Sequence, residues 1–229
     1  MKKCLLCGQY FISKMSFLNL FSLHQKDRKS ICDHCLKKFI HVPEKHCPIC
    51  SGSSKQNQIC SDCVNWQKIY GEKLLINHSV YLYNRAFHDL MVNYKRYGDY
   101  ILYAALQELC VEELSEFKAD VYVPVPTSPE HIAKRQFDTI TALYGSLVPL
   151  TNMLGKKAGL GAQGEKNRAE RLTSEQSFFV KENFTINFQK CTVLLLDDIY
   201  TTGRTLYHAR DALAKIFPNA KISSFTLCR

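Results

Sequence analysis

The chain has 229 residues, enough for one full domain and a small one, and its 46% hydrophobic and 22% charged residues are typical of a globular protein. No apolar run reaches the roughly 18–20 residues of a transmembrane helix, and no signal-peptide core follows Met1, so we expect a cytoplasmic protein. The formal net charge is +9, and residues 1–70 hold 11 Lys and Arg against 4 Asp and Glu. This excess is typical of a module near nucleic acid, although a solvated lysine surface gives the same count.

Eight of the eleven cysteines form four C-x-x-C pairs before residue 64. The pairs are Cys4 with Cys7, Cys32 with Cys35, Cys47 with Cys50, and Cys60 with Cys63. Two such pairs on tight turns hold one tetrahedral zinc ion, so four pairs predict two zinc ions. Four pairs in a loop-rich segment fit this better than one redox motif or a disulfide scaffold. Sequential pairing suits the short span from Cys50 to Cys60, while a cross-braced pairing and nearby histidine ligands (His34, His41, His46) stay open.

Residues 1–66 lack long periodic segments and are predicted to form a small double zinc-ribbon domain. A more apolar insert at Met15–Leu23 is a candidate hairpin between the two metal sites. The cysteine pattern ends near Trp66–Asn77, so we place the boundary there and expect a phosphoribosyltransferase-like domain over residues 78–229 for the reasons that follow.

The second domain is predicted to alternate strands with helices. Strands are expected at Val80–Tyr83, Val121–Val125, Leu147–Leu150, Val193–Leu196 and Ile222–Leu227, and helices around Phe87–Tyr94, Tyr100–Glu116, Pro129–Ser146 and Thr205–Phe217. Gly98 is a candidate C-cap of the first of these helices. Gly155–Glu175 is basic and glycine-rich, as in a functional lid or a disordered connection. The alternation predicts an α/β fold with a doubly wound, mostly parallel sheet.

The most informative stretch runs from Val193 to Thr205. An apolar strand ends in two carboxylates, and a small hydroxyl-rich turn then leads into a helix. Backbone N–H groups at such a helix start bind phosphate. The carboxylates would repel phosphate, so we expect them to accept hydrogen bonds from sugar hydroxyls or to hold magnesium. The candidate residues are Asp197, Asp198, Thr201, Thr202, Gly203, Arg204 and Thr205. The alternative is a strand–turn–helix with a solvated acidic turn.

This stretch resembles the phosphoribosyl pyrophosphate signature of type I phosphoribosyltransferases, except that Tyr200 stands where an aliphatic residue is more usual. With cysteine pairs before it, the whole chain resembles the ComF family, of the ComFC type. Four matches carry this resemblance: the cysteine pairs, Tyr94-Lys95 with Gly98-Asp99, Val123-Pro-Val-Pro126 with Arg135, and Asp197-Asp-Ile-Tyr-Thr-Thr-Gly203. A looser match is Gln163 with Arg171, in the segment that corresponds to the family's mobile lid.

The resemblance implies a competence accessory protein for DNA uptake in natural transformation. It implies binding of phosphoribosyl pyrophosphate or a phosphorylated sugar, of single-stranded DNA, and of a helicase-type ATPase of the ComFA type. Lys95, Arg135 and Arg171 are then candidates to neutralise phosphate charge. Tyr81, Tyr83, Tyr94 and Tyr97 lie near basic residues, as in sites that stack nucleic-acid bases, although core and rim positions explain them too.

One departure bears on activity. The family's Arg-Gly-Phe-Asn-Gln reads Arg135-Gln136-Phe137-Asp138-Thr139 here, which replaces a glycine and adds a negative charge. Both changes disfavour an anion at that loop. An active phosphoribosyltransferase of nucleotide salvage is therefore the alternative function, and no base-recognition motif accompanies it.

Overall fold

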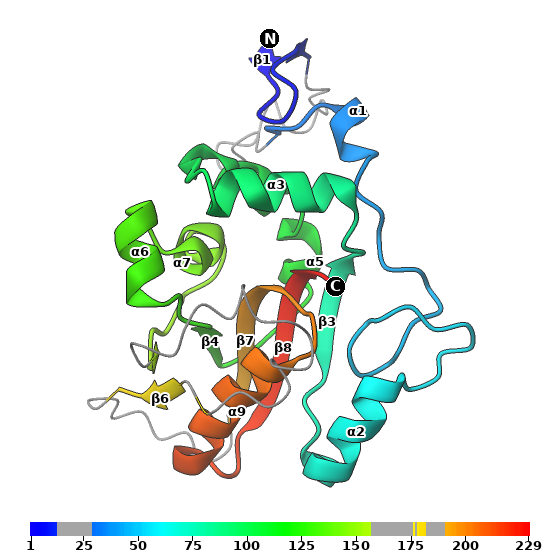
Figure 1. The fold of residues 1–229 in the computed structure, drawn as a ribbon, viewed down its shortest axis with the longest axis vertical. Coiled ribbons are helices and arrows are strands. Elements are labelled where there is room, and N and C mark those ends of the chain that lie inside the picture. Colours follow the sequence, from blue (N-terminus) through cyan, green and yellow to red (C-terminus); the bar gives the residue numbers. More distant parts are fainter. Residues whose placement is uncertain (13–28, 157–175, 177, 182–190) are drawn as a thin grey trace.

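The computed structural model describes residues 1–12, 29–156, 176, 178–181 and 191–229. At its centre lies a four-stranded sheet in the order β3-β8-β7-β4, and every neighbouring pair is parallel (Figure 1). The strands are β3 (Asn77–Tyr81), β4 (Val121–Pro124), β7 (Thr192–Ile199) and β8 (Lys221–Cys228). This sheet, with helices packed on both faces, confirms the predicted α/β fold class.

Two small antiparallel pairs lie outside the central sheet. At the N-terminus β1 (Lys2–Lys3) pairs with β2 (Tyr10–Phe11), and further along β5 (Leu154–Lys156) pairs with β6 (Phe178–Val180). None of the described helices is long and apolar enough to cross a membrane.

The apolar run in β7 contributes side chains to two apolar clusters, because successive side chains of a strand point to opposite faces of the sheet. Val193 and Leu195 join one apolar cluster, and Leu194 and Leu196 join the other. The first cluster is covered by α9 (Arg204–Ile216). The second is covered by α3 (Arg85–Lys95), α4 (Tyr103–Glu108), α5 (Val111–Ser115) and α7 (Thr139–Tyr144). Burial on both faces explains why the stretch Val193–Leu196 of this strand is uninterruptedly hydrophobic.

The predicted helix over Tyr100–Glu116 is three shorter elements. They are the 3-10 helix η3 (Tyr100–Leu102), α4 and α5, with a break at Leu109–Cys110. Leu106, Leu109 and Leu114 are all buried in one cluster. Their spacing suits an unbroken helix equally well, so hydrophobic periodicity does not reveal the break.

The predicted helix over Pro129–Ser146 is also divided, into α6 (Pro129–Arg135) and α7. Gln136 ends α6 in the left-handed region with φ +67°, and the side chain of Asp138 caps α7 by accepting a hydrogen bond from the N–H of Thr141. The predicted strand at Leu147–Leu150 is wrong, because only a single bridge joins Leu150 to Tyr122. Polar capping thus overrides apolar periodicity in this segment.

The N-terminal segment contributes residues to the apolar clusters on both sides of the sheet. It contains α1 (Asp33–Leu36), α2 (Ser61–Tyr70) and the 3-10 helix η2 (Gly71–Lys73). Cys4, Cys32 and Cys35 belong to the same cluster as α3, whereas Cys47, Cys50 and Cys63 share the cluster of α9. The division into residues 1–66 and 78–229 stays a prediction, and α2 runs continuously past residue 66. The insert at Met15–Leu23 lies outside the described residues.

Candidate functional site

The signature loop lies where β7 ends and α9 begins. Strand β7 continues through both carboxylates to Ile199, and the N–H of Tyr200 donates to the carbonyl of Cys228 at 2.9 Å as the strand ends. Gly203 is the N-cap of α9, and the N–H of Arg204, the first residue of the helix, donates to the hydroxyl oxygen of Thr202 at 3.4 Å. The backbone N–H groups at the positive end of this 13-residue helix suit an anion.

Gly203 is required for two reasons. Its φ of +81° is costly for residues that carry a Cβ, and a Cβ there would lie 2.3 Å from the hydroxyl oxygen of Tyr200. The Tyr200 ring is buried against this turn, with 2% exposure. The aromatic residue that departs from the resembled signature therefore packs beneath the backbone of the loop.

The two carboxylates have different surroundings. Asp198 is buried and pairs with the ammonium group of Lys95, at the C-terminal end of α3. Asp197 accepts a hydrogen bond from the N–H of Asp198 at 2.9 Å, and its carbonyl accepts one from the hydroxyl of Tyr144 at 2.9 Å. Both acids are thus held at the carboxyl end of a parallel strand, where sheets of this kind bind ligands.

Asp197 carries a raised pKa. The pKa of this carboxyl is raised to about 7, mainly by burial and also by the neighbouring Asp198 carboxylate, while the Lys95 ammonium opposes the rise. Near neutral pH Asp197 therefore carries about half a proton on average, whereas an ordinary carboxyl would be almost fully ionised. A cation or a sugar hydroxyl that approaches Asp197 favours its ionised form.

Two of the cationic candidates, Lys95 and Arg135, lie at the ends of the neighbouring helices α3 and α6. Arg135, at the end of α6, donates through Nε to the backbone carbonyl of Lys95 at 2.6 Å. This bond ties α6 to α3 and keeps the rest of the guanidinium next to Lys95. The third cation, Arg171, lies outside the described residues, as do residues 157–175 of the predicted lid.

Lys156, at the end of β5, is a neighbour that the sequence did not reveal. Burial lowers the pKa of its ammonium group, while the Asp197 carboxylate opposes that shift. Its Nζ lies 5.7 Å from the ring centre of Phe178, on the paired strand β6. Its position at the beginning of the basic, glycine-rich stretch Gly155–Glu175 was the available signal.

The altered loop after Arg135 has a backbone conformation that glycine would adopt more easily than the glutamine present. Gln136 adopts φ +67°, a conformation that glycine takes at little cost and glutamine takes under strain. The side chain of Asp138 accepts a hydrogen bond from the Thr141 N–H at 2.7 Å, so its negative charge lies at the start of α7 and caps that helix. A glycine at position 136 would therefore take this backbone conformation at a lower cost in energy.

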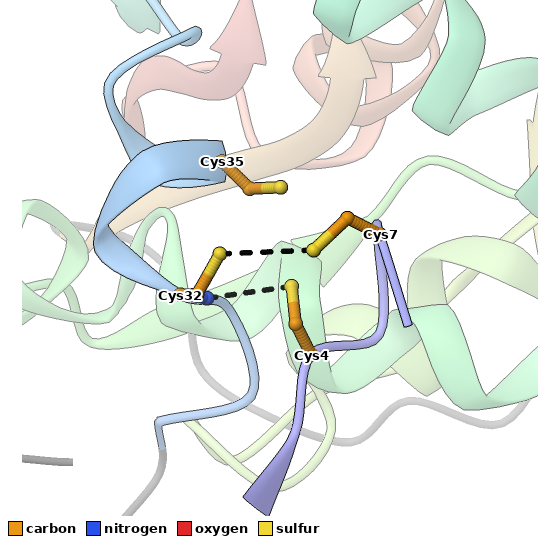
Figure 2. A group of neighbouring side chains, drawn as sticks. All are labelled: Cys4, Cys7, Cys32 and Cys35. Atoms are coloured by element: carbon orange, nitrogen blue, oxygen red, sulfur yellow. Dashed lines mark hydrogen bonds between the residues drawn. The ribbon is translucent and has the colours of Figure 1, made fainter. Parts of the chain in front are cut away.

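The first cysteine group consists of Cys4, Cys7, Cys32 and Cys35, whose sulfur atoms all lie within 4.8 Å of one another. Figure 2 shows the four side chains directed toward one centre, from the N-terminal turn and from the start of α1. The Sγ atoms of Cys7 and Cys32 are 3.8 Å apart, and the N–H of Cys32 donates to Cys4 Sγ. Sulfur atoms on a tetrahedral zinc ion are separated by about 3.8 Å.

The second group consists of Cys47, Cys50, Cys60 and Cys63, again with all sulfur atoms within 4.8 Å. The Sγ atoms of Cys50 and Cys60 are 3.6 Å apart, and the N–H of Cys60 donates to Cys47 Sγ at 3.4 Å. Both groups follow the sequential pairing and fit a tetrahedral metal ion. Across the described residues, histidine joins neither group.

Two residues, Trp66 and Arg229, link the segment of the second cysteine group to the signature loop. Trp66, three residues after Cys63 on α2, donates through Nε1 to the backbone carbonyl of Thr202 at 2.8 Å. Arg229 donates to the carbonyl of Cys50 at 3.2 Å, and its guanidinium lies 5.0 Å above the ring of Tyr200. Neither contact had a local sequence signal, since each partner pair is far apart in the chain.

Comparison with known proteins covers the whole chain. It is 34% identical over 229 residues to competence protein ComFC of Streptococcus pneumoniae (strain ATCC BAA-255 / R6), a match that spans 99% of this chain and 100% of that protein. It is 31% identical over 236 residues to competence protein ComFC of Bacillus subtilis (strain 168), across 99% of this chain and 94% of that one. No protein-family model matches the chain. Both matches therefore include the parts of this chain that hold the cysteine groups and the signature loop.

Proposed function

Because the chain belongs to the ComFC family of competence proteins, we propose that it is a cytoplasmic accessory protein of DNA uptake in natural transformation. Within that role, its loop Asp197–Thr205 binds phosphoribosyl pyrophosphate or another phosphorylated sugar. The observation that carries the sugar-phosphate proposal is the glycine turn at the start of α9, directly beside an acidic pair of which Asp198 is buried against Lys95.

Different residues of the site bind different parts of the ligand. The N–H groups after Gly203, with the hydroxyls of Thr201 and Thr205, receive a phosphate. Asp197 and Asp198 accept hydrogen bonds from ribose hydroxyls, and they are placed to help hold magnesium when a pyrophosphate is present. Lys95, Arg135 and Arg171 offset the remaining negative charge.

Both cysteine groups hold zinc in this proposal, because four thiolates that can surround one ion tetrahedrally suit zinc. Zinc supplies folding energy to segments that have little apolar core of their own. The basic excess of residues 1–70 then surrounds two metal-stabilised modules.

Single-stranded DNA is the proposed macromolecular ligand. The tyrosines near basic residues divide in the structure: Tyr81 and Tyr94 are buried in the core, whereas Tyr83 and Tyr97 are 46% and 78% exposed. Tyr97 follows the exposed Arg96, a combination that suits base stacking beside a phosphate contact. A helicase-type ATPase of the ComFA type is the proposed protein partner.

The binding experiment is calorimetry with ribose 5-phosphate, and with phosphoribosyl pyrophosphate plus magnesium. The double variant Asp197→Asn/Asp198→Asn should bind at least tenfold more weakly than wild type, because two charged hydrogen-bond acceptors are lost. Glu112→Gln/Glu116→Gln removes the same charge from exposed positions at α5 and is the matched control. Equal affinity of wild type and the aspartate variant would exclude the loop as the site.

The role in the cell is tested with a deletion strain that is assayed in parallel for transformation and for growth on salvageable bases. Loss of transformation with normal growth is the expected result. Normal transformation with failed salvage would instead identify the alternative, an active phosphoribosyltransferase.

A further inference from the structure

Trp66 lies between the second cysteine group and the signature loop, and it is the only tryptophan in the chain. Its indole is buried, and its Nε1–H donates to the carbonyl of Thr202 at 2.8 Å. We propose that Trp66 is a positioning residue that holds the phosphate loop in its anion-binding conformation and makes that conformation depend on the second cysteine group. This inference rests on the sugar-phosphate site proposed above.

The hydrogen bond sets the direction of a backbone N–H. The peptide between Thr202 and Gly203 is planar and trans, so its carbonyl and its N–H point in opposite directions. A carbonyl that is held toward Trp66 therefore directs the Gly203 N–H away from the indole. Because Gly203 has no side chain to restrict its dihedral angles, this peptide would otherwise rotate more freely than its neighbours.

The indole itself is held in place by aromatic and cationic neighbours on α2 and α9. It stacks on Tyr207 with ring centres 4.2 Å apart and an interplanar angle of 26°, and Tyr207 stacks in turn on Tyr70 at 4.5 Å. The guanidinium of Arg204 lies 5.8 Å from the Trp66 ring. A donor fixed in this way loses little entropy when it makes the bond to Thr202, so the bond constrains the loop and not the indole.

A second contact couples the same cysteine group to the beginning of the loop. Arg229 donates to the carbonyl of Cys50 and lies over Tyr200, whose hydroxyl oxygen is next to Gly203. The segment that carries the second cysteine group thus reaches the loop on both sides of Thr201. The first cysteine group belongs to the apolar cluster on the other face of the sheet, so this coupling distinguishes the two groups.

The test removes the hydrogen-bond donor of residue 66 and keeps an aromatic ring at that position. Trp66→Phe in the full, metal-loaded chain removes the N–H while it leaves an aromatic side chain to stack on Tyr207. Tyr70→Phe is the matched control, because it removes the hydrogen bond from Tyr70 to Asp211 in the same stack without changing the bond to the loop. Amide hydrogen exchange of residues 201–206 is measured without ligand, together with metal content and the affinity for ribose 5-phosphate.

We expect exchange of these amides to be about five- to tenfold faster in Trp66→Phe, as for loss of one hydrogen bond, and unchanged in Tyr70→Phe. The affinity for ribose 5-phosphate should fall by a similar factor at unchanged metal content. Unchanged exchange in Trp66→Phe would overturn the inference whatever the affinity. Failure of wild type to bind any sugar phosphate would overturn the proposed site instead, and the exchange data would still decide the role of Trp66.

If Trp66→Phe does not fold, a benzothiophene analogue of tryptophan that lacks the N–H is incorporated through a tryptophan auxotroph. Since the chain has a single tryptophan, the analogue enters only at residue 66. The same exchange measurement then applies, with the same two outcomes.

Discussion

The ammonium group of Lys95 pairs with the buried carboxylate of Asp198, which joins the end of α3 to the carboxyl end of β7. Arg135 in turn donates to the backbone carbonyl of Lys95. One cation that suits a phosphate is therefore held by an aspartate of the pair that suits the sugar hydroxyls, and a second cation is tied to the backbone of the first. A ligand that binds both groups meets a site whose charges already balance one another.

Lys95→Met should destabilise the fold by about 2–3 kcal/mol, because it leaves the Asp198 charge buried without its partner. This figure is below the usual range for fully buried pairs because the Lys95 side chain is 28% exposed. The measurement is urea unfolding. Arg85→Met breaks the exposed pair between Arg85 and Asp89 and should cost less than about 1 kcal/mol. Equal costs for the two variants would contradict the burial argument.

Asp197 should make wild-type stability fall as pH rises from about 4 to about 7. Its pKa is raised to about 7 in the folded chain, above the unfolded value of about 3.9, so the folded state keeps a proton that the unfolded chain has released. Asp197→Asn cannot titrate. Its stability relative to wild type should therefore increase over this range, by about 1–3 kcal/mol, and level off above pH 8.

Thermal unfolding of both proteins at each pH measures this difference. Comparison at the same pH is necessary because burial lowers the pKa of His208 to about 4, which makes stability rise with pH in both proteins. A difference that stays constant from pH 5 to pH 8 would show that Asp197 has an ordinary pKa.

Gly203→Ala should abolish binding of ribose 5-phosphate and destabilise the fold, because the new Cβ meets the Tyr200 hydroxyl at 2.3 Å in addition to the strained φ. Gly98→Ala separates these two costs. Gly98 has φ +70° but no atom within 4 Å of the added Cβ, so its substitution should cost only about 1–2 kcal/mol. Chemical unfolding and calorimetry check both variants, and equal losses in the two would show that the Tyr200 contact is unimportant.

The two cysteine groups should affect sugar-phosphate binding differently. Cys7→Ser and Cys63→Ser are each expected to lower the zinc content from about two ions to about one. Only Cys63→Ser should weaken ribose 5-phosphate binding, because only the second group contacts the loop through Trp66 and Arg229. Elemental analysis and calorimetry on the same samples measure this. Equal weakening by both substitutions would show that metal loss acts globally.

Tyr97→Ala should weaken single-stranded DNA binding by about 1–3 kcal/mol, the cost of losing one stacked base. Tyr10→Ala is the matched control, since Tyr10 is also highly exposed, at 69%. Fluorescence anisotropy with a labelled oligonucleotide, repeated at several salt concentrations, gives both the affinity and the number of phosphate contacts. Equal affinities for the two variants would remove Tyr97 from the DNA-binding surface.

Local patterns were sufficient for the chemistry of single segments. The four C-x-x-C pairs predicted two groups of four cysteines, and the run from Val193 to Thr205 predicted a strand, an acidic end, a turn and a helix. These predictions succeed because a C-x-x-C turn and a strand–turn–helix depend on residues that are close in the chain. Helix boundaries were less predictable, since capping by Asp138 and the left-handed Gln136 divide a segment whose apolar spacing is continuous.

Contacts between distant segments had no such signal. Trp66 and Thr202 are 136 positions apart, yet one hydrogen bond joins them, and Lys95 finds Asp198 only because α3 ends beside β7. Which cysteine group lies on which face of the sheet follows from the packing of α3 and α9 and not from the spacing of the cysteines. Residue types therefore specify which ligands each segment can bind, whereas long-range packing specifies which segments act together, because it is the burial of shared apolar surface that brings them into contact.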